Sequence, residues 1–204
     1  KDDDDREKMY RFIDDKVSEG RQVYVVAPLI EDSEVLNVKS AQQTFEEYSK
    51  IFKNRKIALM HGRLKSKEKQ DIMEEFKEGK TDILISTTDI EVGVNVPNST
   101  IMVIRDAQRF GLSSLHQLRG RVGRGSLRSY CFLESVTDND LSIRRLEVME
   151  RTTDGFKISE EDLKLRNSGE IFGTKQSGVS DLMLIDIIKN VKEIKEIQEK
   201  KVYK

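Results

Sequence analysis

The stretch Ile83-Leu84-Ile85-Ser86-Thr87-Thr88 is an apolar run of strand length that ends in a row of hydroxyl groups. A continuous apolar run is typical of a strand in a parallel sheet, because helices cover both faces of such a sheet. Apolar runs of similar length recur at residues 23–29, 57–60, 101–104 and 130–133. The sequence therefore predicts a sheet built from several buried strands.

Amphipathic helices are predicted between these strands. Apolar residues step by four, three and four in the first of them: Ala41, Phe45, Tyr48 and Phe52. Ser66 is the expected N-cap and Gly79 the expected stop of a second helix, and an S-x-x-Q capping box at Ser114 and Gln117 predicts a third. Strands that alternate with helices in this way predict an α/β fold, with a mainly parallel sheet flanked by helices.

The pattern divides the chain into three parts. Residues 1–20 hold an acidic start and a linker helix, and residues 21–150 hold the α/β body. Residues 151–204 are predicted to form a smaller, mostly helical extension with polar, glycine-punctuated loops. An apolar stripe between residues 184 and 194 predicts a terminal helix within this extension.

Charge is balanced over the whole chain but not along it. The formal net charge is -1, yet six arginines and one acid lie between Arg105 and Arg128. A local basic patch of this kind suits phosphate recognition. The single cysteine, Cys131, is expected to be an inert core thiol, and no metal site is predicted. Without a membrane span or secretory signal, we expect a soluble intracellular protein.

Gln117-Leu118-Arg119-Gly120-Arg121-Val122-Gly123-Arg124, here called the arginine motif, places three arginines and two glycines close together. Arginine presents a planar, permanently charged set of donors that matches phosphate oxygens, and glycine permits the tight backbone that such convergence needs. The motif is therefore a candidate for supplying charge to a phosphoryl transition state. Alternatively, an arginine-rich loop is simply solvated or binds any polyanion.

Two further polar segments follow predicted strands. Thr87 and Thr88 open the segment 86–97, where hydroxyl and amide groups suit phosphate binding, although two threonines can equally cap a turn. Gly62 and Arg63 follow the strand at residues 57–60 and suit contact with a nucleic-acid backbone.

A complete nucleotide pocket is not evident in the sequence. The phosphate-binding loop of ATPases reads G-x-x-x-x-G-K-[ST] after a strand. Gly79-Lys80-Thr81 matches the end of this pattern, but the first glycine would have to lie at position 74, which is Glu. The tripeptide also follows a predicted helix and not a strand. The chain thus has arginines for a phosphoryl transition state and no evident residues to hold the nucleotide.

In this order, the segments resemble the second RecA-like domain of superfamily 2 helicases. The arginine motif resembles motif VI, residues 86–97 resemble motif V, and residues 23–31 and 60–63 resemble motifs IV and IVa. Arg109-Phe110-Gly111-Leu112 and Gly173-Thr174-Lys175-Gln176-Ser177-Gly178 are similar to the RecG family of DNA branch-migration helicases. The second of these segments is part of a translocation motif that the RecG and Mfd families share.

The resemblance implies roles for particular residues. In ATP hydrolysis it implies an arginine finger at Arg124, a neighbour at the γ-phosphate at Arg121, and an orienting side chain at Gln117. Residues near the ATP cleft would be Glu91, Gly93 and Asn95. DNA-backbone contacts would come from Arg63, Thr87 and Thr88, and coupling of ATP turnover to DNA movement from Arg166, Glu170 and Gln176.

The resemblance also implies partners. ATP and Mg²⁺ would be held mainly by a first RecA-like domain of the same protein. Branched double-stranded DNA would be bound by the present chain together with an N-terminal wedge domain. We expect action in the bacterial cytoplasm, associated with the nucleoid, and no membrane partner. The activity implied is ATP-dependent remodelling of branched DNA, by fork reversal and Holliday-junction branch migration, in recombination and repair.

Several positions depart from the pattern of the family. Asp89 replaces a hydrophobic residue, Asn95 replaces Asp, Arg105 and Gln108 replace acids, and Asn167-Ser168 replaces Gly-Pro. Arg105 is expected to make this face more basic. Alternative interpretations are a fragment of an Mfd-type translocase or of a replication-restart helicase, or a non-catalytic module that binds nucleic acid or protein.

Overall fold

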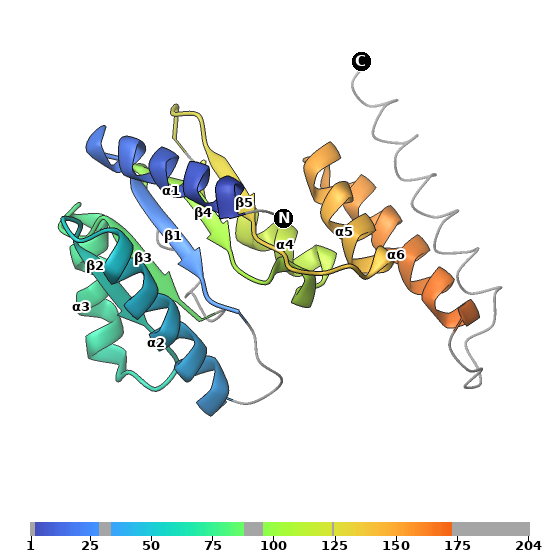
Figure 1. The fold of residues 1–204 in the computed structure, drawn as a ribbon, viewed down its shortest axis with the longest axis horizontal. Helices are drawn as coiled ribbons and strands as arrows, with labels where there is room; N and C mark the ends of the chain where they lie inside the picture. The colour runs from blue at the N-terminus through green and yellow to red at the C-terminus, as the bar shows by residue number, and fades with distance from the viewer. Residues whose placement is uncertain (1–2, 29–33, 88–95, 124, 173–204) are drawn as a thin grey trace, which may run out of the picture. The chain divides into compact units, whose positions relative to one another are not determined.

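A five-stranded parallel sheet with helices packed on it forms the main body of the fold (Figure 1). The computed structural model describes residues 3–28, 34–87, 96–123 and 125–172, with the backbone alone for residues 3, 34 and 166–172. The strand order is β2-β3-β1-β4-β5, and each neighbouring pair is parallel. The strands are β1 (Gln22–Val26), β2 (Ile57–Met60), β3 (Ile83–Ser86), β4 (Ser99–Ile104) and β5 (Tyr130–Leu133). The predicted α/β fold is confirmed.

Helices cover both faces of the sheet. On one face, α1 (Asp3–Ser18) and α2 (Glu34–Ile51) pack Ile13 and Tyr48 against strand residues such as Val25. On the other, α3 (Ser66–Lys77) and α4 (Leu112–Arg119) pack Phe76 and Leu115 against Tyr24 and its neighbours. The 3₁₀ helix η1 (Ala107–Arg109) precedes α4, and α5 (Asp140–Arg151) and α6 (Gly155–Phe172) come after the last strand. Alternate residues of each strand thus enter opposite cores, which explains why the strands are apolar throughout.

The structure corrects two predicted helix starts. Lys65, not Ser66, is the N-cap of α3, and its N–H donates to the Glu68 carboxylate over 2.8 Å. The capping box predicted at Ser114 is also wrong, because α4 begins at Leu112 after an N-cap at Gly111. Gly79 follows the last turn of α3 with φ +74°, as its predicted role as a helix stop requires.

Two compact units make up the chain, Lys1–Arg166 and Asn167–Lys204. The first contains the whole sheet and α1 to α5. The boundaries predicted at residues 20 and 150 stay predictions, and the apolar stripe between residues 184 and 194 lies outside the described residues. No helix in the described part of the chain is long and apolar enough to span a membrane.

Candidate functional site

The carboxyl ends of β2 and β3 bring two of the predicted DNA-binding residues to one edge of the sheet. Arg63 follows β2 and Thr87 follows β3, and these strands pair in register with Met60 beside Ser86. The Thr87 N–H donates to the carbonyl oxygen of Met60 over 3.2 Å, so Thr87 lies beside the end of β2. We call this the carboxyl edge.

Positive charge at the carboxyl edge is open to solvent. Arg63, Lys65 and Lys67 are exposed, and Arg63 has no ion pair among the described residues. The Glu68 carboxylate is occupied by the N–H of Lys65. Exposed cations beside a helix N-terminus suit the phosphate oxygens of a nucleic-acid backbone.

The arginine motif lies at the opposite end of the sheet. After α4 the chain returns through residues 120–129 to the start of β5. Arg21, just before β1, donates to the carbonyl oxygen of Arg128 over 3.3 Å. A Cβ built on Gly125 would lie 3.4 Å from the carbonyl oxygen of Pro97, which precedes β4. This segment therefore borders the amino ends of β1 and β4, called here the amino edge.

Arg121 is the described arginine of the motif that remains available at the amino edge. Its side chain is partly exposed and forms no ion pair with a described residue. Gln117 is exposed on α4, one turn earlier. Gly123 has φ +84°, a conformation that favours glycine, so the tight backbone expected of this motif is present.

Arg119 does not point to a ligand as the sequence suggested. Its Nη1 donates to the carbonyl oxygens of Met149 at 2.7 Å and Thr152 at 2.9 Å, and its Nη2 lies 3.2 Å from His116 Nδ1. Met149 lies in α5 and Thr152 is the C-cap of α5, where a cation is favourable. Arg119 therefore joins α4 to the end of α5, a role that the sequence did not reveal.

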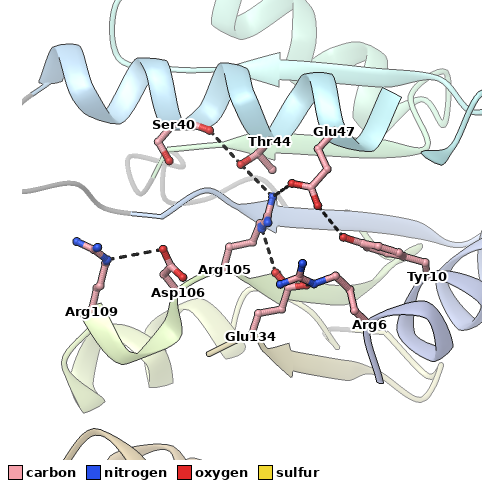
Figure 2. A network of polar contacts seen from close by, with 9 residues as sticks. All are labelled: Arg6, Tyr10, Ser40, Thr44, Glu47, Arg105, Asp106, Arg109 and Glu134. Carbon is pink, nitrogen blue, oxygen red and sulfur yellow. Dashed lines mark hydrogen bonds and ion pairs between the residues drawn. The ribbon is translucent and has the colours of Figure 1, made fainter. Parts of the chain in front are cut away.

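The predicted basic patch has less free positive charge than its number of arginines suggests. Arg105 donates to the Glu47 carboxylate at 2.6 Å and to the Glu134 carboxylate at 3.0 Å, as Figure 2 shows. Its side chain is only 15% exposed. The expectation that Arg105 makes this face more basic is wrong, because two carboxylates surround it. Asp106 likewise lies 3.7 Å from Arg109.

A cleft of about 350 Å³ lies beside the arginine motif. It is lined by His116, Arg119, Gly120, Val122, Ser129, Tyr130, Cys131 and Thr153. Burial raises the pKa of the Cys131 thiol to about 11, so the thiol stays protonated near neutral pH. A protonated thiol fits the inert role expected for Cys131, although the residue is partly buried beside the cleft and not fully buried in the core. The described residues contain no group of three or more His, Cys, Asp or Glu side chains suited to a metal ion.

The remaining predicted site residues fall where the structure gives no side-chain account. Arg166 and Glu170 belong to α6, for which only the backbone is described at those positions. Outside the described residues lie Arg124, Thr88, Glu91, Gly93, Asn95 and Gln176.

Comparison with known proteins identifies the fold and the family. A family model described as helicase conserved C-terminal domain matches residues 5–126, and one described as ATP-dependent DNA helicase RecG, domain 3, C-terminal matches residues 152–202. The ATP-dependent DNA helicase RecG of Streptococcus pneumoniae is 52% identical over 92% of this chain and 28% of the relative. RecG of Aquifex aeolicus is 53% identical over 85% of this chain and 22% of the relative.

Solved structures agree with these matches. A RecG bound to a three-way DNA junction matches with a TM-score of 0.71 and 44% identity, over 93% of this chain and 24% of that one. Domain 2 of the DEAD-box helicase Mss116p, bound to an RNA duplex, matches with a TM-score of 0.56 over 78% of this chain and 63% of that one. At 18% identity the second match shows the fold alone.

The chain spans roughly a quarter of the length of these RecG relatives, 28% and 22% in the two cases above. It belongs to the helicase conserved C-terminal domain family, and its similarity is to the C-terminal part of RecG helicases.

Proposed function

We propose that this chain is the C-terminal motor portion of an ATP-dependent DNA helicase that remodels branched DNA, by fork reversal and Holliday-junction branch migration, in recombination and repair. The observation that carries the proposal is its similarity to RecG over 92% of the chain. The match covers 28% of that relative. In the protein that we propose, a first RecA-like domain and a wedge domain would act together with this chain. Such a protein would act on the bacterial nucleoid, in the cytoplasm.

The amino edge would supply half of the ATP site. Arg121 is partly exposed there without a carboxylate partner among the described residues, which leaves its guanidinium free for the γ-phosphate. Arg124 would act as the arginine finger, which stabilises negative charge on the transferring phosphoryl group. Arginine fingers are worth roughly 10³–10⁵ in turnover. Gln117 would orient the attacking water or the phosphate.

The rest of the ATP site would come from another domain. The sequence has no phosphate-binding loop after a strand, and the described residues include no cluster of metal ligands. The first RecA-like domain would therefore bind ATP and Mg²⁺. Glu91, Gly93 and Asn95 would line this chain's side of the cleft.

The carboxyl edge would hold the DNA backbone. Arg63 is exposed three residues after Met60, whose carbonyl oxygen accepts from the Thr87 N–H, and Thr88 follows Thr87 in the sequence. Because the strands join the two edges rigidly, closure of the ATP cleft at one end would shift the DNA contacts at the other. The extension with Arg166, Glu170 and Gln176 would couple this movement to the duplex.

ATP hydrolysis on forked DNA tests whether this chain supplies only part of the ATP site. The chain alone should not hydrolyse ATP, and the whole protein that contains it should do so. Hydrolysis by the chain alone would reveal a complete nucleotide pocket within these residues. It would refute the proposal that this chain supplies only half of the ATP site.

A matched pair of arginine variants of the whole protein tests the DNA edge. Arg63→Ala should raise the DNA concentration needed for half-maximal stimulation and reduce the salt slope of binding by about one, since one phosphate contact is lost. Arg151→Ala is the control, because Arg151 is exposed on α5 and pairs with Glu147 at 3.0 Å. Equal effects of the two substitutions would contradict a specific role for Arg63.

A further inference from the structure

A largely buried set of charges joins the carboxyl ends of β4 and β5 (Figure 2). Arg105 is the first residue after β4, and Glu134 is the first residue after β5. Arg105 Nε donates to Glu134 Oε2 at 3.0 Å, and Arg105 Nη1 donates to Glu47 Oε2 of α2 at 2.6 Å. One guanidinium thus connects two strands and a helix.

Helix α1 adds a second layer of contacts to the same carboxylates. The Tyr10 hydroxyl donates to Glu47 Oε1 at 3.0 Å, and Arg6 Nε lies 3.8 Å from Glu134 Oε1. The side chains of Arg105 and Glu134 are 15% and 13% exposed. Burial lowers the pKa of Arg105, but Glu134 and Glu47 more than offset this effect and raise it. Without Arg105, the Glu134 carboxylate would have little solvent and would lose the guanidinium that it shares with Glu47, whose side chain is 36% exposed.

The next residue has an unusual backbone. Asp106 has φ 47° and ψ 47°, and among the described residues it is the one non-glycine residue with positive φ. This conformation costs about 1–2 kcal/mol in most L-residues, whereas Asp and Asn tolerate it better because their short polar side chains can hydrogen-bond locally. Glu134 N–H donates to Ile104 O at 2.9 Å, whereas Glu134 O accepts from Ala107 rather than Asp106, at 2.7 Å. Asp106 is therefore an extra residue in the ladder, as in a β-bulge.

This turn sets the direction in which the chain leaves the sheet. It leads into η1 and then into α4, which carries Gln117 and ends at Arg119, two residues before the partly exposed Arg121. On the far side of the turn, Arg109 N–H donates to Asp106 O at 2.9 Å and Arg109 Nε lies 3.7 Å from the Asp106 carboxylate. The left-handed residue is thus held by contacts on both sides.

We propose that Arg105 and Asp106 form a positioning joint: Arg105 anchors the end of β4 to β5 and α2, and the left-handed turn at Asp106 aims α4 so that the arginine motif meets ATP. Arg105 is a positioning residue that acts through α4 and does not touch the nucleotide. This inference rests on the proposed function for its effect on catalysis. The joint itself is a property of this chain, and it can be measured separately.

Charge removal separates positioning from simple stability. Arg105→Met alone leaves the poorly solvated Glu134 carboxylate without its guanidinium partner and is expected to lower the melting temperature. The triple variant Arg105→Met/Glu47→Gln/Glu134→Gln removes the three charges together, so that none of the three is left as an unpaired charge. It should therefore melt within a few degrees of wild type and yet lack the anchor at Arg105.

Two readouts on the triple variant decide the question. In the 204-residue chain, amide hydrogen exchange of α4 should rise at least tenfold while exchange of α3 stays unchanged. In the whole protein, kcat for ATP at saturating forked DNA should fall about tenfold with KM for ATP within twofold, because a displacement of about 1 Å can lower the rate up to about 100-fold. If the triple variant shows the wild-type rate of amide hydrogen exchange in α4, or a kcat within twofold of wild type, the proposed positioning joint is refuted.

A pair of substitutions at Asp106 gives an independent check. Asp106→Asn keeps a residue that tolerates the left-handed region and should retain the wild-type kcat and α4 exchange. Asp106→Val introduces a β-branched residue that does not tolerate it and should reproduce both defects of the triple variant. Equal behaviour of the two variants contradicts the role of the turn. A wild-type protein without ATPase activity would refute the proposed function, whereas hydrogen exchange would still test the joint.

Discussion

Gly123 offers a quantitative test of the backbone geometry of the arginine motif. Its φ of +84° lies in the region that L-residues avoid. A Cβ built at this position would lie 2.8 Å from Ser129 Oγ and 3.1 Å from Ser129 Cβ. Gly123→Ala should therefore destabilise the domain both through its backbone and through contact with Ser129.

The magnitude can be divided with two matched glycine variants. Gly79→Ala has a similar φ of +74° with no atom near the new Cβ, so it measures the backbone cost alone, about 1–2 kcal/mol. Gly120→Ala has φ −69° and meets only ordinary contacts beyond 3.4 Å, so it should be neutral or slightly stabilising. Gly123→Ala should exceed Gly79→Ala by about 0.5–1.5 kcal/mol, because Ser129 must move off its rotamer.

Urea unfolding of the chain, followed by circular dichroism, gives these free energies from the midpoint at constant slope. The double variant Gly123→Ala/Ser129→Gly should recover the contact part of the loss and leave the backbone part. If Gly123→Ala proves no more destabilising than Gly120→Ala, the left-handed turn in the motif is refuted.

Two further predictions concern residues beside the cleft. Burial raises the pKa of Cys131 to about 11, so the folded state keeps a proton that the unfolded state loses above about pH 9. The free energy of unfolding should consequently fall as pH rises from 9 towards 11, by about 1.4 kcal/mol more at pH 10 in wild type than in Cys131→Ala; parallel pH profiles for the two would contradict this. Arg119→Gln should lose about 1.5–3 kcal/mol, because the Met149 and Thr152 carbonyls lose a charged donor. A urea midpoint equal to that of the Arg151→Gln control would argue against the Arg119 anchor.

The central strands could be predicted from the sequence because β1, β3 and β4 are buried along their whole length. The apolar runs at residues 57–60 and 130–133 coincide with the edge strands β2 and β5, which are mostly only partly buried. The start of α4 was predicted wrongly because tertiary packing, and not the local capping signal, determines where this helix begins. Burial of Leu112 and Leu115 in the core extends the helix beyond the local capping signal at Ser114.

The arginines show where sequence reasoning ends. The sequence shows their number and spacing, but their partners are distant in the chain. Arg105 pairs with residues 29 and 58 positions away, and Arg119 binds backbone carbonyls 30 and 33 positions away. A backbone carbonyl leaves no mark in the sequence, so Arg119 could not be separated from Arg121 before the fold was known. The assignment of ATP and DNA contacts to particular residues stays a prediction.

The most direct test of the account is the turnover of ATP by the whole protein at saturating forked DNA, compared between wild type and Arg124→Ala. As an arginine finger, Arg124 should contribute roughly 10³–10⁵ to kcat, with little change in ATP affinity. Arg124→Lys keeps the charge but loses the planar fork and should recover only a small part of the rate. A kcat for Arg124→Ala within tenfold of wild type would contradict the claim that this chain completes the ATP site.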